Sequence, residues 1–207
     1  MNYEVGIVNL NPNIKDIHTL ENACRSIGYK PFILDAIQIN KDKIYKYIKK
    51  SHIKKWIFSG SKFMVTDSWS IKIPIEIFDI KDKEFMLICY SLQSAIYQMD
   101  YPISYRRVNK KEYFNLYIER ENIEYLNKEY LFNNITMPMK VWRNHYAYLS
   151  SAHIDRNNEN NLIYLTSYEN ECMILFYKNA ILLQYHPEKT EDGLQLMWNW
   201  LRKINYF

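Results

Sequence analysis

Three side chains from two distant segments of this 207-residue chain could together form a nucleophilic site. Cys89 stands at the end of an apolar segment, and His186 and Glu188 flank a proline much further along the chain. A thiol needs a base to act as a nucleophile near neutral pH, and the base needs a partner that orients it. The thiol, the imidazole and the carboxylate could supply all three groups.

The neighbouring residues indicate how the backbone would position these groups. Pro187 disfavours the helical region for His186 and so predicts an extended backbone there. Alternate side chains of an extended chain share a face, so Glu188 can point the same way as His186 and accept a hydrogen bond from its ring. Cys89 stands where an apolar strand gives way to a helix, and the dipole of a helix N-terminus stabilises a thiolate.

The first half of the chain alternates apolar strands with helices. We expect strands at residues 5–10, 31–34, 56–58 and 85–89, and helices at residues 13–27, 41–50 and 90–99. This alternation is typical of the α/β class, with an open, mainly parallel sheet and helices on both faces. Ligands of such sheets bind at the carboxyl ends of the strands, where Cys89 and the segment Ser59-Gly60-Ser61 are expected to lie.

The second half of the chain is richer in short segments with period-two alternation, which predicts additional, antiparallel strands. We expect strands at residues 103–108, 113–119, 137–142, 162–167, 172–177 and 180–185, a hairpin turn at Lys178-Asn179, and a surface loop at residues 156–161. A closing helix is expected at about residues 191–203, with an inward face formed by Leu194, Leu196, Met197, Trp200 and Leu201. No linker rich in Pro, Gly or Ser is visible, so we expect residues 1–207 to form a single domain.

These motifs resemble those of the class I (triad) glutamine amidotransferases. The family elbow is Gly-x-Cys-x-Gly-x-Gln and its second motif is Gln-Phe-His-Pro-Glu. The residues that match by type and order are Cys89, Gln93, Gln184, His186, Pro187 and Glu188. Residues 57–61, followed by Asp67, resemble the family's Leu-Ser-Gly-Gly-Pro loop. Residues 141–145 are similar to a stretch of the amidotransferase domain of GMP synthase, whereas residues 186–190 and 13–15 resemble the glutaminase subunit of imidazole glycerol phosphate synthase.

The elbow departs from the family pattern at two positions. Leu87 and Ser91 stand where the family has glycines, which relieve crowding at a turn whose nucleophile is usually strained. Ser91 is small, but Leu87 requires space among its neighbours. Ser61 and Lys62 replace the usual Gly-Pro of the next loop, so we expect that loop to sit differently.

The resemblance implies an enzyme that hydrolyses L-glutamine to glutamate and ammonia, with the ammonia passed to a separate synthetase partner. It gives Cys89 the role of nucleophile, His186 that of the base, and Glu188 that of the orienting group. The residues that it implies for oxyanion and substrate binding are Gly60, Ser61, Tyr90, Gln93, Asn144 and His145.

The sequence leaves two other functions open. A relative with impaired catalysis could keep the fold as a binding or regulatory protein, and Leu87 is the feature that separates it from a working enzyme. A free-standing γ-glutamyl hydrolase could use the same three catalytic side chains on another γ-glutamyl compound.

Composition excludes several other classes of protein. The net charge of +4 comes from lysines spread along the chain, and no nucleic-acid recognition motif is present, so no nucleic-acid partner is expected. The three cysteines show no paired or metal-binding spacing, which predicts a reducing compartment and neither a metal nor another cofactor. No segment is long and apolar enough to span a membrane, and no signal peptide is visible. We therefore expect a cytoplasmic protein.

Overall fold

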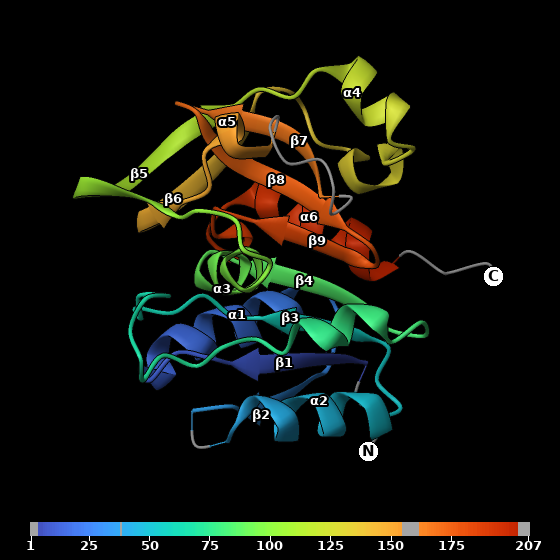
Figure 1. Ribbon diagram of the computed structural model, residues 1–207. Helices are drawn as coiled ribbons and strands as arrows, with labels where there is room; N and C mark the ends of the chain where they lie inside the picture. The colour runs from blue at the N-terminus through green and yellow to red at the C-terminus, as the bar shows by residue number, and fades with distance from the viewer. Residues whose placement is uncertain (1–3, 38, 155–161, 203–207) are drawn as a thin grey trace.

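The computed structural model describes residues 4–37, 39–154 and 162–202 (Figure 1). Within these residues, a seven-stranded sheet has the order β2-β1-β3-β4-β9-β8-β7. The strands are β1 (Val5–Asn9), β2 (Pro31–Asp35), β3 (Lys55–Phe58), β4 (Glu84–Ile88), β7 (Ile163–Tyr168), β8 (Glu171–Tyr177) and β9 (Ala180–Leu183). From β2 to β9 the neighbours pair in parallel, and β8 and β7 continue the sheet antiparallel. The predicted α/β class with an open, mainly parallel sheet is confirmed.

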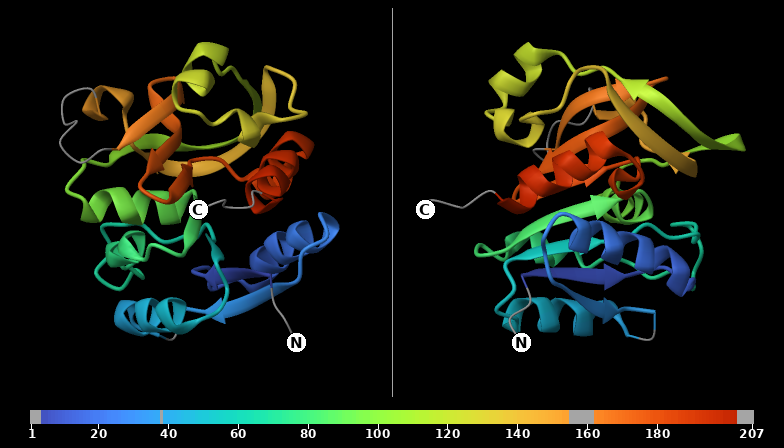
Figure 2. Two further views of the ribbon diagram at one scale, coloured as in Figure 1. Left: turned by 90° about the vertical axis from the view of Figure 1, so that its right-hand side faces the viewer. Right: turned by 180° about the vertical axis from the view of Figure 1, so that it is seen from behind.

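Helices cover both faces of this sheet (Figure 2). Helices α1 and α6 share a hydrophobic core with one face of the central strands, whereas α2, α3 and η1 share a second core with the other face. The helices are α1 (Ile14–Ser26), α2 (Lys41–Lys50), α3 (Tyr90–Gln98), α4 (Arg120–Tyr125), α5 (Ser151–Ile154) and α6 (Glu191–Arg202), with 3-10 turns η1 (Ile75–Asp79), η2 (Glu129–Phe132) and η4 (Pro187–Lys189).

Local sequence sets the ends of the helices in the first half. The side chain of Asn13 accepts a hydrogen bond from the N–H of Lys15 at the start of α1, and Asn40 plays the same part at the start of α2. Gly28 follows α1 with a φ of 92°, a left-handed conformation that favours glycine. On α6 four of the five residues predicted to face inward are buried, and Leu194 is partly buried against the same core.

A separate two-stranded antiparallel sheet is formed by β5 (Ser104–Leu116) and β6 (Met139–Tyr148). The sequence predicted two strands in place of β5, because the polar residues 109–111 interrupt the apolar alternation. In the structure Lys110 and Lys111 pair with His145 and Asn144 of β6, so the backbone stays extended, with a bulge between Tyr105 and Lys110. Strand β6 was predicted to end at residue 142 and instead continues to Tyr148.

Five short helical segments of the described chain were not predicted, namely η1, α4, η2, α5 and η4, each of which has too few residues for a helical period to show. The predicted turn at Lys178-Asn179 does join β8 to β9. The predicted loop at residues 156–161 lies outside the described residues. Among the residues described, the structure contains no helix of the length and apolar character needed to cross a membrane.

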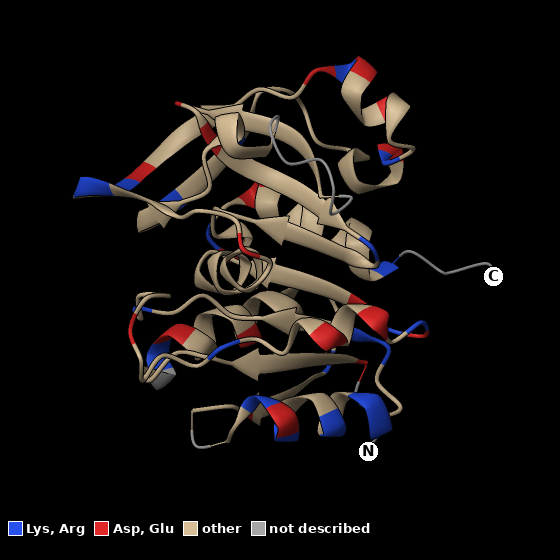
Figure 3. Ribbon diagram, viewed as in Figure 1, with Lys and Arg blue, Asp and Glu red and all other residues tan. Residues whose placement is uncertain are grey.

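Charge is distributed unevenly over the strands (Figure 3). The inner strands β1 and β9 carry no charged side chain, whereas β5 carries Arg106, Arg107, Lys110, Lys111 and Glu112. Charged side chains are therefore concentrated on the small sheet, although an ion pair between Lys55 and Glu84 at 3.4 Å also joins β3 to β4.

Candidate active site

Cys89 lies in the sharp turn between β4 and α3. Its backbone has φ 53° and ψ −106°, a conformation that residues with a side chain rarely adopt. The turn is held on both sides, because the N–H of Cys89 donates to Leu183 O at 2.7 Å and the N–H of Gln93 donates to Cys89 O at 3.1 Å. A strained strand-to-helix turn of this kind raises a nucleophile above the edge of the sheet.

The structure shows how this elbow is built without its two glycines. Leu87 is fully buried on β4, in register with Phe58 of β3 and Leu182 of β9. The hydroxyl of Ser91 lies 3.0 Å from Phe58 O and 2.9 Å from Ile88 O. The Ser91 side chain therefore ties α3 to the ends of two strands, and Leu87 belongs to the core on that face of the sheet.

His186 follows β9 with the extended backbone that Pro187 predicts. The chain then enters the 3-10 turn η4, which brings Glu188 Oε1 to 2.8 Å from His186 Nδ1. The predicted contact between His186 and Glu188 is present, but it is formed by a 3-10 turn and not by a continuing strand. The N–H of His186 donates to Trp142 O at 2.8 Å, and the Trp142 ring meets the imidazole edge-on at 5.2 Å between centroids.

Charges around His186 favour its protonated form. Burial lowers the pKa of its imidazole, but the Glu188 carboxylate and the Cys89 sulfur outweigh burial and raise the pKa to about 10. Burial raises the pKa of Glu188, but His186 outweighs it, and the net shift is downward. The other thiol near this site, Cys24, differs: burial above all, and then Glu188, raise its pKa to about 12.

Gly60 lies at the end of β3, directly against these two side chains. A Cβ at this position would be 2.9 Å from His186 Cε1 and 3.6 Å from Cys89 Cβ, so only glycine allows this approach. The loop that follows is folded on itself: Ser61 Oγ accepts from the N–H of Phe63 at 3.3 Å, and Asp67 Oδ2 accepts from the N–H of Met64 at 3.2 Å.

A cavity of about 250 Å³ opens at this end of the sheet. The predicted site residues that line it are Gly60, Ser61, Cys89, Gln93, Asn144, His145, His186 and Glu188. Tyr90 does not line the cavity, because its side chain is buried below the elbow and donates to Ile71 O at 2.8 Å. As the first residue of α3, Tyr90 still has a backbone N–H without an acceptor inside the helix.

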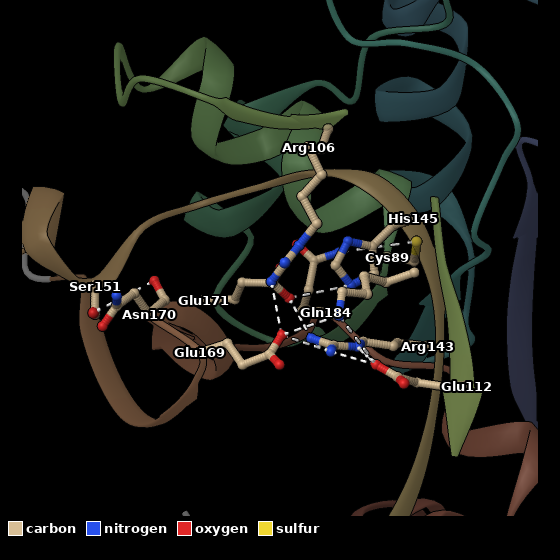
Figure 4. Close-up of polar contacts among 12 residues, drawn as sticks. Cys89, Arg106, Glu112, Arg143, His145, Ser151, Glu169, Asn170, Glu171 and Gln184 are labelled. Atoms are coloured by element: carbon tan, nitrogen blue, oxygen red, sulfur yellow. Dashed lines mark hydrogen bonds and ion pairs between the residues drawn. The ribbon is translucent and has the colours of Figure 1, made fainter. Parts of the chain in front are cut away.

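Strand β6 supplies one wall of the cavity through Trp142, Asn144, His145, Tyr146 and Ala147, which we call the β6 wall. Gln93 Nε2 donates to Ala147 O at 2.7 Å, and so the β6 wall is joined to α3. Gln184 Nε2 and Asn144 O each lie 4.0 Å from the sulfur of Cys89, and Figure 4 draws Gln184 beside Cys89.

The sequence missed several lining residues. They are Asn11, Asp16, Ile17, Leu20, Lys62, Phe63, Met64, Asn109, Trp142, Tyr146, Ala147 and Lys189, while Ser59, which was expected at this end of the sheet, lines the cavity as well. The nearness of Trp142 and Tyr146 to the predicted Asn144-His145 pair was an available signal. The sequence held no such signal for Asn109, because this residue reaches the cavity through the bulge in β5. There its Nδ2 donates to Asn144 Oδ1 at 2.6 Å.

The described residues contain no cluster of three or more His, Cys, Asp or Glu side chains placed to hold a metal ion. Cys24, Cys89 and Cys172 are all free thiols. The chemistry that these residues offer is therefore that of a thiol beside an imidazole and a carboxylate.

Residues 14–202 match the family described as glutamine amidotransferase class-I. The chain belongs to this family. No curated protein matches the chain by sequence.

Solved structures with the same fold include a protein from Thermoplasma acidophilum described as one of the GMP synthase subunits, with a TM-score of 0.66 and 13% identity over 97% of this chain and 94% of that one. A glutamine amidotransferase from Thermotoga maritima has a TM-score of 0.65 and 15% identity over 97% and 82% of the two chains. The PurLQS structure from Thermotoga maritima has a TM-score of 0.63 and 15% identity over 96% and 97%. At these identities the likeness shows the fold.

Proposed function

We propose that this chain is a glutaminase, a single amidotransferase domain over residues 1–207 that hydrolyses L-glutamine through Cys89, His186 and Glu188. The observation that carries the proposal is the strained Cys89 beside an imidazole whose Nδ1 lies 2.8 Å from a carboxylate, in a cavity of about 250 Å³. A nucleophile, a base and an orienting group in this order are what thiol-based acyl transfer requires.

In the proposed reaction the Cys89 sulfur attacks the side-chain amide carbon of glutamine. His186 takes the thiol proton and returns it to the leaving nitrogen, so that ammonia departs and a glutamyl thioester remains on Cys89. A water then attacks the thioester carbon, giving up its proton through His186, and glutamate leaves with the thiol restored. Glu188 stabilises the imidazolium during both transfers.

The oxyanion of each tetrahedral intermediate needs hydrogen-bond donors. We assign the backbone N–H groups of Tyr90 and of the Gly60-Ser61 segment to this role, and each such donor typically contributes about 3–4 kcal/mol. Gln93, Asn144 and His145 line the remainder of the cavity and are assigned to binding of the substrate.

An affinity label tests the nucleophile. A glutamine analogue with a diazo-ketone group, 6-diazo-5-oxo-norleucine, should label Cys89, located by mass spectrometry of peptides. Cys24 and Cys172 are controls within the same chain, because neither lines the cavity that Cys89 lines, and burial raises the pKa of Cys24 to about 12. An adduct on either of them, with Cys89 unmodified, would overturn the assignment.

Mutant kinetics test whether the three groups act as one unit. Cys89→Ala and His186→Ala should each remove nearly all glutaminase activity, and the double variant should be little worse. Glu188→Gln should cost less than either single change. Strictly additive losses would show that Cys89 and His186 do not share a site.

We also propose that the ammonia passes to a separate synthetase. The same-fold structures include the Thermoplasma acidophilum protein described as part of GMP synthase, and PurLQS, which supports an assembly of several proteins. The expected result is weak glutaminase activity of the isolated chain and stimulation by the cognate synthetase. Robust turnover by the isolated chain would favour the free-standing γ-glutamyl hydrolase.

A further inference from the structure

A second cavity, of about 610 Å³, lies beside α2. Its walls are the start of β2, one side of α2 and the loop of residues 51–53 that leads into β3. Strand β3 begins beside this cavity and ends beside Gly60, so the cavity lies at the opposite end of the sheet from Cys89. No described residue lines both this cavity and the one at Cys89. We call it the α2 cavity, and its aromatic and basic lining residues are Phe32, Lys43, Lys46, Tyr47, Lys50 and His52.

Three lysines form a row along the side of α2 that faces the α2 cavity. Lysines recur along this helix (Figure 3), and Lys43, Lys46 and Lys50 follow one another at spacings of three and four residues. Within the described residues none of the three forms an ion pair, and no carboxylate lines the cavity. Like charges at this spacing destabilise a helix. A bound anion would remove that repulsion.

The helix dipole does not account for the whole row. Cations are favourable near a helix C-terminus, which suits Lys50 in the last turn of α2. Lys43 lies in the first turn, where the dipole disfavours a cation. At a rise of 1.5 Å per residue, the row from Lys43 to Lys50 is about 10 Å long. A row of this length matches a short polyphosphate better than an extended polyanion.

Two stacked rings supply the apolar part of the α2 cavity. The rings of Phe32 and Tyr47 lie 5.4 Å apart between centroids, at an interplanar angle of 6°. Trp56 meets both of them edge-on, at 6.3 and 6.2 Å, and so supports the pair from the buried side. The Tyr47 side remains 42% exposed. Flat aromatic surfaces of this kind bind the face of a planar ligand, and a nucleobase is such a ligand.

The loop on the remaining wall is held in place by buried groups. Lys83, with a side chain only 2% exposed, donates from Nζ to Ser51 O at 2.7 Å. Trp56 Nε1 donates to Ile53 O at 3.0 Å. His52 lies between these two anchored residues and lines the cavity. The α2 cavity is therefore preformed, as small-molecule sites usually are, and its volume lies in their usual range.

We infer that the α2 cavity binds a nucleoside phosphate. The lysine row takes the phosphates, for which lysine ammonium groups act as point charges, and the Phe32–Tyr47 pair stacks against the base. Every base has a flat face, so stacking of this kind accepts any base. Because no residue is shared with the cavity at Cys89, this inference does not rest on the proposed glutaminase function.

Calorimetric titration of the full chain tests the inference. The probes are ATP, inorganic triphosphate, which has the charge without the base, and adenosine, which has the base without the charge. ATP should bind with a Kd below about 1 mM, and about 10-fold more tightly than triphosphate, the effect of one stacked base. Adenosine should bind more weakly than ATP.

Two matched pairs of substitutions test the lysine row. Lys43→Gln combined with Lys46→Gln should weaken both ATP and triphosphate about 10-fold, since each lysine loses a charged contact that is partly screened by solvent. Lys41→Gln combined with Lys49→Gln changes the net charge equally on the same helix, but neither of these lysines lines the cavity. This control pair should keep the wild-type affinity for ATP. Circular dichroism and the thermal midpoint verify that both variants fold.

A third variant tests the rings. Tyr47→Leu should lower the affinity for ATP to that for triphosphate and leave the affinity for triphosphate unchanged. If this variant does not fold, the ratio of the two affinities in the wild type still decides whether the base makes a contact.

Four results would overturn the inference. They are a failure of ATP to bind, equal affinities for ATP and triphosphate, equal losses in the two lysine pairs, and tighter binding of a single-stranded oligonucleotide than of ATP. The third result would mean attraction by net charge alone, and the fourth would make the ligand a nucleic acid. Loss of glutaminase activity is not among them, so this inference and the proposed function can fail separately.

Discussion

Replacing Leu87 by glycine, the residue that the family has at this position, should destabilise the protein. Leu87 is fully buried between Phe58 and Leu182 of the flanking strands. Changes from leucine to alanine at buried sites cost about 3–5 kcal/mol, depending on how far the surroundings collapse. Glycine inside a strand costs about 0.5–1 kcal/mol more than alanine. We therefore expect Leu87→Gly to lower the free energy of unfolding by about 3.5–6 kcal/mol.

The measurement is urea denaturation of the wild type and the variants, with the m-value compared to verify two-state unfolding. Leu182→Ala is the matched control for Leu87→Ala, because Leu182 is equally buried, lies beside Leu87 on β9 and does not belong to the elbow. The two alanine variants should lose similar free energies of unfolding. The rate at which 6-diazo-5-oxo-norleucine labels Cys89 then reports whether the turn at Cys89 keeps the sulfur reactive. This rate should not rise in Leu87→Gly.

The opposite result would mean that Leu87 strains the turn. A Leu87→Ala loss far below that of Leu182→Ala, or a Leu87→Gly variant that is more stable and labels faster, would refute the reasoning. It would favour a catalytically impaired relative with a binding or regulatory role.

Three further predictions concern residues around His186. Tyr185→Phe should raise the free energy of unfolding by about 1–3 kcal/mol in urea denaturation, because no described residue offers the buried Tyr185 hydroxyl a hydrogen-bond partner, and a loss of stability would contradict this. The pKa of His186 is raised from 6.5 to about 10, so its protonated form contributes stability that is complete below about pH 6.5 and is lost as the pH rises toward 10. Between these two pH values the free energy of unfolding should fall further in the wild type than in His186→Gln, and equal losses would contradict this. Gly60→Ala should slow labelling of Cys89 about 100-fold and lower the urea midpoint, because its Cβ would displace His186 from its place beside Cys89 and Glu188, and an unchanged labelling rate would contradict this.

The sequence was a good guide wherever the determining residues are close together in the chain. The strand before Cys89 and the helix after it, the extended backbone at His186, and the positions of α1 and α2 all depend on neighbours within a few positions. Each was predicted correctly because apolar periodicity and the effect of proline act locally.

The parts that were missed depend on distant partners. The sequence treated Glu171 as outside the strand that begins at residue 172, whereas it is the first residue of β8 and fully buried. Its burial is possible only because Arg106 and Arg143 arrive from two other strands. The continuity of β5 likewise depends on its pairing with β6, since its polar residues give no alternation of their own.

The elbow shows which property of the family's glycines this chain has had to replace. Glycine is required where φ is positive or where a Cβ would collide with another atom. The positive φ of this turn belongs to Cys89 itself, while Leu87 lies within β4 and Ser91 within α3, both in regular secondary structure. At those two positions glycine would be needed for its small size and not for its freedom to adopt a positive φ. The core beside Phe58 and Leu182 holds the leucine, and the serine hydroxyl bonds the ends of β3 and β4. The strain at the nucleophile is therefore retained although both glycines are gone, which is why we assign Cys89 a catalytic and not a structural role.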